Sequence, residues 1–291
     1  MKRLLTTCFQ WLLISLLSLT AFALCAQETR PPSESEPPAR ETKRLLRFDY
    51  GMNMGFYMAH PGTANYYNGT GEHNIESIIN QTYNYNRIWQ DIGSNFKIAD
   101  NGLPMQMSYK PAVMLGFFGS IHFSSRAGLH AEFNYARLKA EDKFALEIER
   151  AVFVQGDNIE LYDIWGTEER LDLRFSFQYT FISKNSYLHP FLETGLSITD
   201  TKVKENRIRV ESQTLAIRNP TSTYYQIRDF GIGFGGFATF GLKMDVNENF
   251  ALWGGYSANY SRINLGENDR FLLQHAIFLR FSLAGLTSGT N

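Results

Sequence analysis

The sequence predicts an all-β fold, an eight-stranded antiparallel transmembrane β-barrel with long extracellular loops. Three observations support this prediction. Along many stretches, apolar side chains alternate with small or polar ones, which is the period of a β-strand. Several of these stretches run to ten residues or more, whereas the strands of soluble proteins average about five or six. The connections between them alternate between long and short, as in transmembrane barrels.

The alternation is clearest in residues 228–283, which form three consecutive predicted strands. In FGIGFGGFATFGLKMD one face is apolar, and the opposite face carries mainly glycine and threonine. Short turns at 247–249 and 266–269 separate this run from ALWGGYSANYSRI and then from FLLQHAIFLRFSL, which alternates in the same way. Such runs match strands that expose one face to lipid and the other to the barrel interior.

Five earlier strands complete the predicted barrel, at 46–58, about 110–123, 127–139, 169–182 and 189–200. The clearest is ERLDLRFSFQYTFI, where Leu171, Phe175 and Phe177 face lipid while Asp172 and Arg174 face inward. An eight-stranded barrel has an interior just wide enough for side chains, so the sequence predicts no open pore.

Three long connections are predicted, at 59–108, at about 141–168 and at about 201–227. The first is expected to contain a helix with Asn74 as N-cap, folded over the barrel mouth, with a partial apolar face of Ile75, Ile78, Ile79, Ile88 and Trp89. The third carries most of the remaining basic residues, Lys202, Lys204, Arg207, Arg209 and Arg218. Because long connections of such barrels are external, both chain ends are expected in the periplasm.

The N-terminus predicts export. Residues 1–26 read as a cleaved signal peptide: Met1-Lys2-Arg3 precedes an apolar core, and Ala21-Phe22-Ala23 is a small-x-small cleavage site, with cleavage after Cys25 or Ala26 as alternatives. A lipid-modified Cys25 is a further alternative, opposed by Leu24 where a small residue is the rule. Residues 27–45 are rich in Pro, Glu and Ser and predict a disordered periplasmic linker. Residues 46–283 form the predicted barrel and 284–291 a C-terminal tail.

Composition excludes several other classes. The 291 residues carry a formal net charge of −1, so nothing indicates a nucleic-acid partner. After the N-terminus no apolar run is long enough for a membrane-spanning helix. Both cysteines, Cys8 and Cys25, lie in the signal region, which leaves no disulfide framework in the mature chain.

Strand parity places four charged residues inside the barrel. Glu132, Arg174, Glu193 and Arg280 fall at inward positions of four different strands. Because an isolated charge in a narrow interior is costly to desolvate, we expect these four to pair in a structural salt-bridge network that closes the lumen. A gated ion path is the functional alternative.

No metal, cofactor or catalytic site is predicted. His122, His130 and His189 face inward near the periplasmic end, but one strand separates His189 from the other two, and no carboxylate is expected at metal-ligand spacing. An outer-membrane lipid-modifying enzyme would need a His, Ser and carboxylate near the outer leaflet. His60 and His73 lie in the first loop with Glu72 and Glu76 nearby, yet no Gly-x-Ser-x-Gly elbow accompanies them.

In outline the chain resembles the small barrels of the OmpA/OmpX type, and more closely the PorT-type outer-membrane β-barrel proteins of Bacteroidetes. The resemblance covers residues 46–283 and rests on the signal, the short polar linker, the opening strand LRFDYGMNMGFYM and the glycine-rich late strands GIGFGGFATFGLKMDV and ENFALWGGYS. Two departures are a longer first loop and the tail AGLTSGTN after HAIFLRFSL. The resemblance implies a link to envelope assembly or type IX secretion.

Together these patterns predict an integral protein of the bacterial outer membrane with a filled, non-conducting interior. Its expected role is structural or partner-binding, with outer-membrane lipid and envelope or secretion-system proteins as partners, and we expect no enzymatic activity. The alternatives are a small-solute channel and an outer-membrane lipid-modifying enzyme. A soluble lipocalin-like barrel would need an apolar interior, which the inward charges oppose.

Overall fold

The computed structural model describes residues 46–70, 74–150, 158–182, 187–217, 230–247, 249–265 and 270–284. The predicted signal peptide at 1–26, the linker at 27–45 and the tail after residue 284 lie outside these described residues. So do His73 and Glu72 of the first loop.

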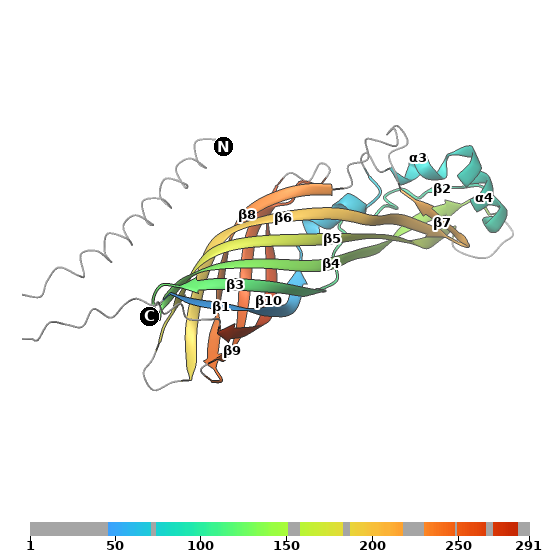
Figure 1. Ribbon diagram of the computed structural model, residues 1–291. Helices are drawn as coiled ribbons and strands as arrows, with labels where there is room; N and C mark the ends of the chain where they lie inside the picture. The colour runs from blue at the N-terminus through green and yellow to red at the C-terminus, as the bar shows by residue number, and fades with distance from the viewer. Residues whose placement is uncertain are drawn as a thin grey trace, which may run out of the picture. The chain divides into compact units, whose positions relative to one another are not determined.

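Eight strands close into an antiparallel ring (Figure 1). They are β1 (Arg47–Met58), β3 (Ala112–His122), β4 (Ala127–Ile148), β5 (Ile159–Thr180), β6 (Leu188–Val210), β8 (Phe230–Asp245), β9 (Phe250–Arg262) and β10 (Phe271–Ala284). Each pairs with the next, and β1 pairs with β10, for example at Asn53↔Arg280. The ring therefore has no free edge, and the predicted eight-stranded barrel is confirmed.

The two faces of the ring strands differ as the alternation predicts. Outward side chains are apolar and exposed, including Phe117 at 61% and Ile232 at 63% of their surface. Inward positions are buried and mostly polar, including Asn53, Ser257 and Gln274. This is the reverse of a water-soluble fold, whose apolar side chains face the interior.

Three strands continue beyond the ring. The β4–β5 register runs without a break past Leu138↔Glu168 to Glu147↔Ile159, and β6 extends to Val210 before β7 (Gln213–Ala216) turns back along it (Figure 1). The predicted loop at 141–168 is therefore wrong, because much of it belongs to β4 and β5. The predicted loop at 201–227 is wrong in its first half. The charged residues at outward positions make these segments look like loops in the sequence. In a strand whose outer face meets water, however, charged and apolar side chains alternate just as regularly.

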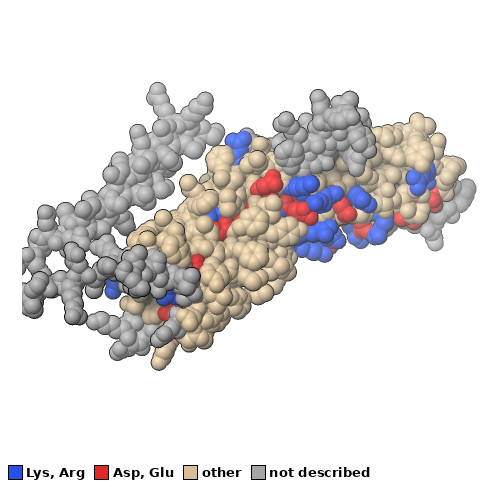
Figure 2. Space-filling model, viewed as in Figure 1, with Lys and Arg blue, Asp and Glu red and all other residues tan. Residues whose placement is uncertain are grey.

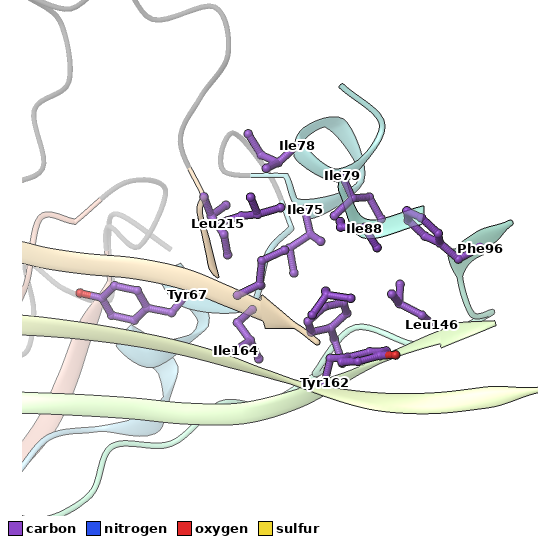
Figure 3. Packing of buried hydrophobic residues seen from close by; sticks show 14 of the residues in the cluster. Tyr67, Ile75, Ile78, Ile79, Ile88, Phe96, Leu146, Tyr162, Ile164 and Leu215 are labelled. Atoms are coloured by element: carbon purple, nitrogen blue, oxygen red, sulfur yellow. The ribbon is translucent and has the colours of Figure 1, made fainter. Parts of the chain in front are cut away.

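These extensions form a second compact region, here called the head. Short β2 (Phe96–Ile98) pairs with β4, and β7 pairs with β6, which gives the sheet order β2-β4-β5-β6-β7. Helices α3 (Ile75–Ile79) and α4 (Thr82–Ile92) cover one face of this sheet. Figure 3 shows their isoleucines packed on sheet residues in a hydrophobic cluster that includes Ile75, Ile79, Ile88, Leu146 and Ile164.

A β-bulge in β6 joins the ring to the head. The register with β5 shifts between Thr167 and Glu168, which leaves Lys204 without a register partner. Inward residues of β6 are odd-numbered in the ring, such as Thr201, but even-numbered in the head, such as Ile208. The extra residue turns Ile208 toward the head core, because a shift of one residue exchanges the two faces of a strand.

The first loop contains the predicted helix start. The Asn74 Oδ1 accepts from the amides of Glu76 (2.8 Å) and Ser77 (3.4 Å), so the predicted N-cap is confirmed. Two details are wrong. Trp89 is 44% exposed and not part of the apolar face, and α3 lies on the head sheet and not over the mouth. None of the described helices is long and apolar enough to span a membrane.

Replacing Ile88 with alanine is expected to destabilise the head by about 2–5 kcal/mol, because the side chain is fully buried and leaves a cavity. The neighbouring exposed Trp89→Ala serves as the control, with an expected change within about 0.5 kcal/mol. Limited proteolysis should cut the head of the Ile88 variant faster, while the ring strands stay protected. Equal cleavage of both variants would contradict a tightly packed head.

Candidate functional site

Three arginines occupy the interior at successive levels. Arg280 of β10 lies deepest, Arg174 of β5 lies above it, and Arg170 of β5 lies at the mouth, the end of the ring that faces the head. Each is no more than 2% exposed. Because buried guanidinium groups need both a counter-charge and hydrogen-bond acceptors, their partners define the interior.

Arg280 connects three strands that are not neighbours in the ring. Its Nη1 donates to Glu193 Oε2 on β6 at 2.7 Å, and its Nη2 donates to Glu132 Oε2 on β4. The guanidinium also lies 4.4 Å from the ring centroid of Phe278, at cation–π distance. A single side chain therefore ties β10 to two strands on other sides of the lumen.

The remaining carboxylate oxygens of this group are also satisfied. Glu132 Oε1 accepts from the amides of Asn53 and Asn134, both at 2.5 Å. Glu193 Oε1 accepts from the Ser176 hydroxyl at 2.6 Å. Such secondary hydrogen bonds are what a buried ion pair needs to persist.

Arg174 lies opposite Glu132 in the β4–β5 register, but its ion pair is with Asp172. Its Nε donates to Asp172 Oδ2 at 2.5 Å and its Nη1 to Ser257 Oγ at 3.2 Å. Asp172 Oδ1 in turn accepts from the Thr199 hydroxyl at 3.0 Å. The structure thus brings together Glu132, Glu193 and Arg280 and pairs Arg174 within its own strand. The sequence analysis placed Asp172 inward but did not name it as a partner, although residues two apart in a strand share a face.

A third group, the mouth cluster, consists of Tyr57, Thr63, Tyr67, Tyr109, Glu168, Arg170 and Gln274. Arg170 donates to Glu168 Oε1 (2.6 Å), to the Tyr57 hydroxyl (3.1 Å), to Gln274 Oε1 (3.0 Å) and to the Thr63 hydroxyl (3.1 Å). Thr63 belongs to α2 (Pro61–Ala64), so this part of the first loop covers the mouth. The cluster is not apparent from the sequence, because Glu168 falls within the loop predicted at 141–168.

Two tyrosines complete the mouth cluster from above. Tyr67 of the 3-10 helix η1 (Asn65–Tyr67) and Tyr109 donate to Glu168 Oε2 at 2.7 and 3.0 Å. Burial, reinforced by the Glu168 carboxylate, raises the pKa of both hydroxyls well above 10.0. The Tyr67 ring rests on Gly166, where an added Cβ would lie 2.0 Å from the ring. Glycine is therefore required at this position for the tyrosine to reach Glu168.

The three inward histidines lie beside three different carboxylates. His122 Nε2 is 3.2 Å from Asp49, His189 Nε2 is 3.4 Å from Asp245, and His130 Nε2 is 3.6 Å from Glu132. The expectation that no carboxylate lies at ligand distance is wrong, since donor atoms of His130, Glu132 and Glu193 lie within 4.8 Å of one another. Arg280 already engages both glutamates, so this donor set holds a guanidinium.

His60 and Glu76, two of the first-loop residues that an enzyme could use, belong to different helices. His60 Nδ1 accepts from the Gly62 amide at 2.9 Å and caps α2, while Glu76 is exposed in the first turn of α3. His60 thus has a structural role that explains its position.

The chain is similar to solved structures of small outer-membrane barrels. Neisserial surface protein A matches with a TM-score of 0.38 and 11% identity over 81% of this chain and 96% of its own. The attachment invasion locus protein Ail of Yersinia pestis gives 0.33 and 10% over 81% and 97%. The N-terminal barrel domain of Pseudomonas aeruginosa OprF gives 0.32 and 9% over 82% and 97%. No protein-family model and no curated protein matches the chain.

Arg280→Met is expected to destabilise the folded chain by about 3–5 kcal/mol, because it leaves Glu132 and Glu193 buried without their cation. The triple variant with Glu132→Gln and Glu193→Gln should recover most of that loss, since no uncompensated charge remains. Urea titrations in detergent micelles, followed by tryptophan fluorescence, measure both free energies of unfolding. Arg87→Met, at an exposed position of α4, is the control. Equal losses in the single and triple variants would contradict a charge-paired interior.

Proposed function

We propose that this protein is an integral outer-membrane β-barrel, closed to solutes, that presents its head as a partner-binding surface outside the membrane. The observation that carries the proposal is the apolar belt on the outside of the ring. Exposed apolar side chains cover outward positions of all eight strands, with Leu196 at 71% and Phe240 at 60% exposure among them. A soluble monomer rarely exposes a contiguous apolar surface of this extent.

The height of the belt matches a bilayer. Along β5 and the residue after it, the apolar outward positions run from Leu171 to Phe181, or ten residue steps. At about 3.3 Å per residue and a strand tilt of about 40°, this run spans roughly 25 Å along the barrel axis, the height of the lipid-facing band of outer-membrane barrels. The first outward charge above it is Glu169.

The distribution of charge supports the same boundary. In Figure 2, basic and acidic side chains gather on β4–β6 beyond the ring, while the visible surface of the ring strands carries few charges. Surface ion pairs occur there between Lys204 and Glu169 and between Arg209 and Asp163. A water-exposed head above a lipid-exposed ring accounts for both surfaces.

The closed lumen is supported by the three arginine levels. Arg280 crosses the interior to β4 and β6, and Arg170 joins β5 to β1, β10 and α2. Hydrated ions would have to break these buried pairs to pass, at a cost of several kcal/mol for each pair.

The head supplies a surface that a minimal barrel lacks. Tyr83, Met105 and Leu161 remain 70%, 80% and 63% exposed on it. The sheet face opposite the helices carries an open groove of about 550 Å³, lined mainly by charged side chains and by Trp165. Exposed aromatic and apolar side chains among charges are typical of interaction surfaces. On the PorT-type resemblance of residues 46–283, the proposed partners are proteins of the envelope or of type IX secretion.

Two measurements test the barrel and its lumen. Protein extracted from the outer-membrane fraction is expected to migrate differently on a gel before and after boiling, since a closed barrel stays folded in detergent. The same protein in planar bilayers is expected to give no single-channel currents. Recovery in the soluble periplasm would overturn the membrane assignment, and stepwise conductance would overturn the closed lumen in favour of a small-solute channel.

Site-specific photo-crosslinking in whole cells tests the role of the head. A photoreactive side chain at Leu161 or Trp89 should give protein adducts of one defined mass, because both positions are exposed on the head. The same group at Phe175, in the apolar belt, is the control and should give only lipid adducts. If the head positions give no protein adduct, the partner-binding role is excluded.

A further inference from the structure

A row of charges crosses the outer surface of three strands directly above the apolar belt. Arg137, Glu169 and Lys202 are register partners on β4, β5 and β6. Lys204, the bulged residue, donates to Glu169 at 2.7 Å. Arg137 and Lys202 are exposed and form no ion pair with any residue that the structure describes. We call Arg137, Lys202 and Lys204 the cationic row.

The three cations of the cationic row outnumber the carboxylates beside them. These carboxylates are Glu169 and, two residues below Lys202 on β6, the exposed Asp200. Farther up the head, cations and carboxylates pair with one another, as in Lys139 with Glu141. Because they lie directly above the apolar belt, the unpaired Arg137 and Lys202 are at the level where the headgroups of the proposed membrane would begin.

A second feature lies below the row on the same side of the ring. An apolar groove of about 670 Å³ crosses the outer surface of β1, β3, β4, β5 and β6, with Tyr50, Leu129, Phe175 and Leu196 among its lining residues. Gly119 lies in it, and a Cβ added there would meet no atom within 4 Å. The belt is therefore hollowed at this point.

The spacing of the two features matches one lipid. From Arg137 to Ala131, which lines the groove, β4 advances six residues. That is about 20 Å along the strand and about 15 Å along the barrel axis, the hydrocarbon depth of a single leaflet. A lipid with its headgroup on the row would place its chain ends in the groove.

We propose that this surface is a specific binding site for an outer-leaflet glycolipid whose headgroup carries phosphates. Arg137, Lys202 and Lys204 bind the phosphates, and the groove over Gly119 and Ala131 receives an acyl chain. Arginine and lysine are the side chains that bind phosphate in proteins. This inference rests on the proposed outer-membrane location. It adds a specific ligand, because the lipid-facing surface of a barrel without such a site would not distinguish this glycolipid from other lipids.

Native mass spectrometry of the full chain in detergent tests the site. The probes are a diphosphorylated glycolipid with long acyl chains and its dephosphorylated form. The wild-type chain is expected to retain one copy of the phosphorylated form in preference to the other. Arg137→Gln with Lys202→Gln should weaken that binding roughly 30-fold, from about fivefold for each basic group. Lys143→Gln, an exposed lysine higher on β4, is the matched control.

Gly119→Leu tests the groove separately. Because the added Cβ would meet no atom within 4 Å, the barrel should still show the heat-dependent gel shift while binding of the long-chain glycolipid falls. Binding of a short-chain analogue should be unchanged. Gly254→Leu, also on the outward face but on β9, is the control.

The outcomes separate this inference from the proposed function. Loss of the gel shift in the wild-type chain would overturn the membrane barrel itself. An intact gel shift with equal retention of both glycolipid forms, or with wild-type binding by the double glutamine variant, would overturn the lipid site alone.

Discussion

The interior of an eight-stranded ring admits side chains and little else, so every charge within it must find a partner among the other inward side chains. Arg280 meets this constraint with one planar group that binds two glutamates from different strands. These ion pairs link β4, β6 and β10 to one another, in addition to the backbone hydrogen bonds that join each strand to its neighbours. At higher levels Arg174 pairs with Asp172 and Arg170 with Glu168, in both cases with the carboxylate two residues away on β5.

The head depends on the ring in turn. Its sheet is not a separate domain but the continuation of β4, β5 and β6, which leave the ring at the mouth cluster. Glu168 lies at this junction, where it accepts from Arg170 below and from Tyr67 and Tyr109 above. The bulge at Lys204 lies at the same level and reorients β6 for the head core. The buried ion pairs, the mouth cluster and the bulge that orients β6 for the head core therefore lie within a few residues of one another on β5 and β6.

Much of the ring could be read from the sequence, because alternation with period two is a local signal. It gave the eight strands, their faces and the inward Glu132, Glu193 and Arg280. The head could not be read in this way. Its outward positions hold Glu141 and Lys143, which resemble a solvent-exposed loop. Its core joins Ile75 and Ile88 to Leu146 and Ile164, which are distant in sequence. The partner of Arg174 and the bulge at Lys204 depend on register, which a single strand does not specify.

The continuity of three strands from ring to head also determines how force would travel through the molecule. A partner that pulls on the head along the strands loads β4, β5 and β6 in shear, so that many backbone hydrogen bonds share the load at once. A hairpin peeled from its turn would instead release its bonds one pair at a time. The head is thus attached to the barrel wall through three continuous strands, and tension applied along them would be carried directly into the ring.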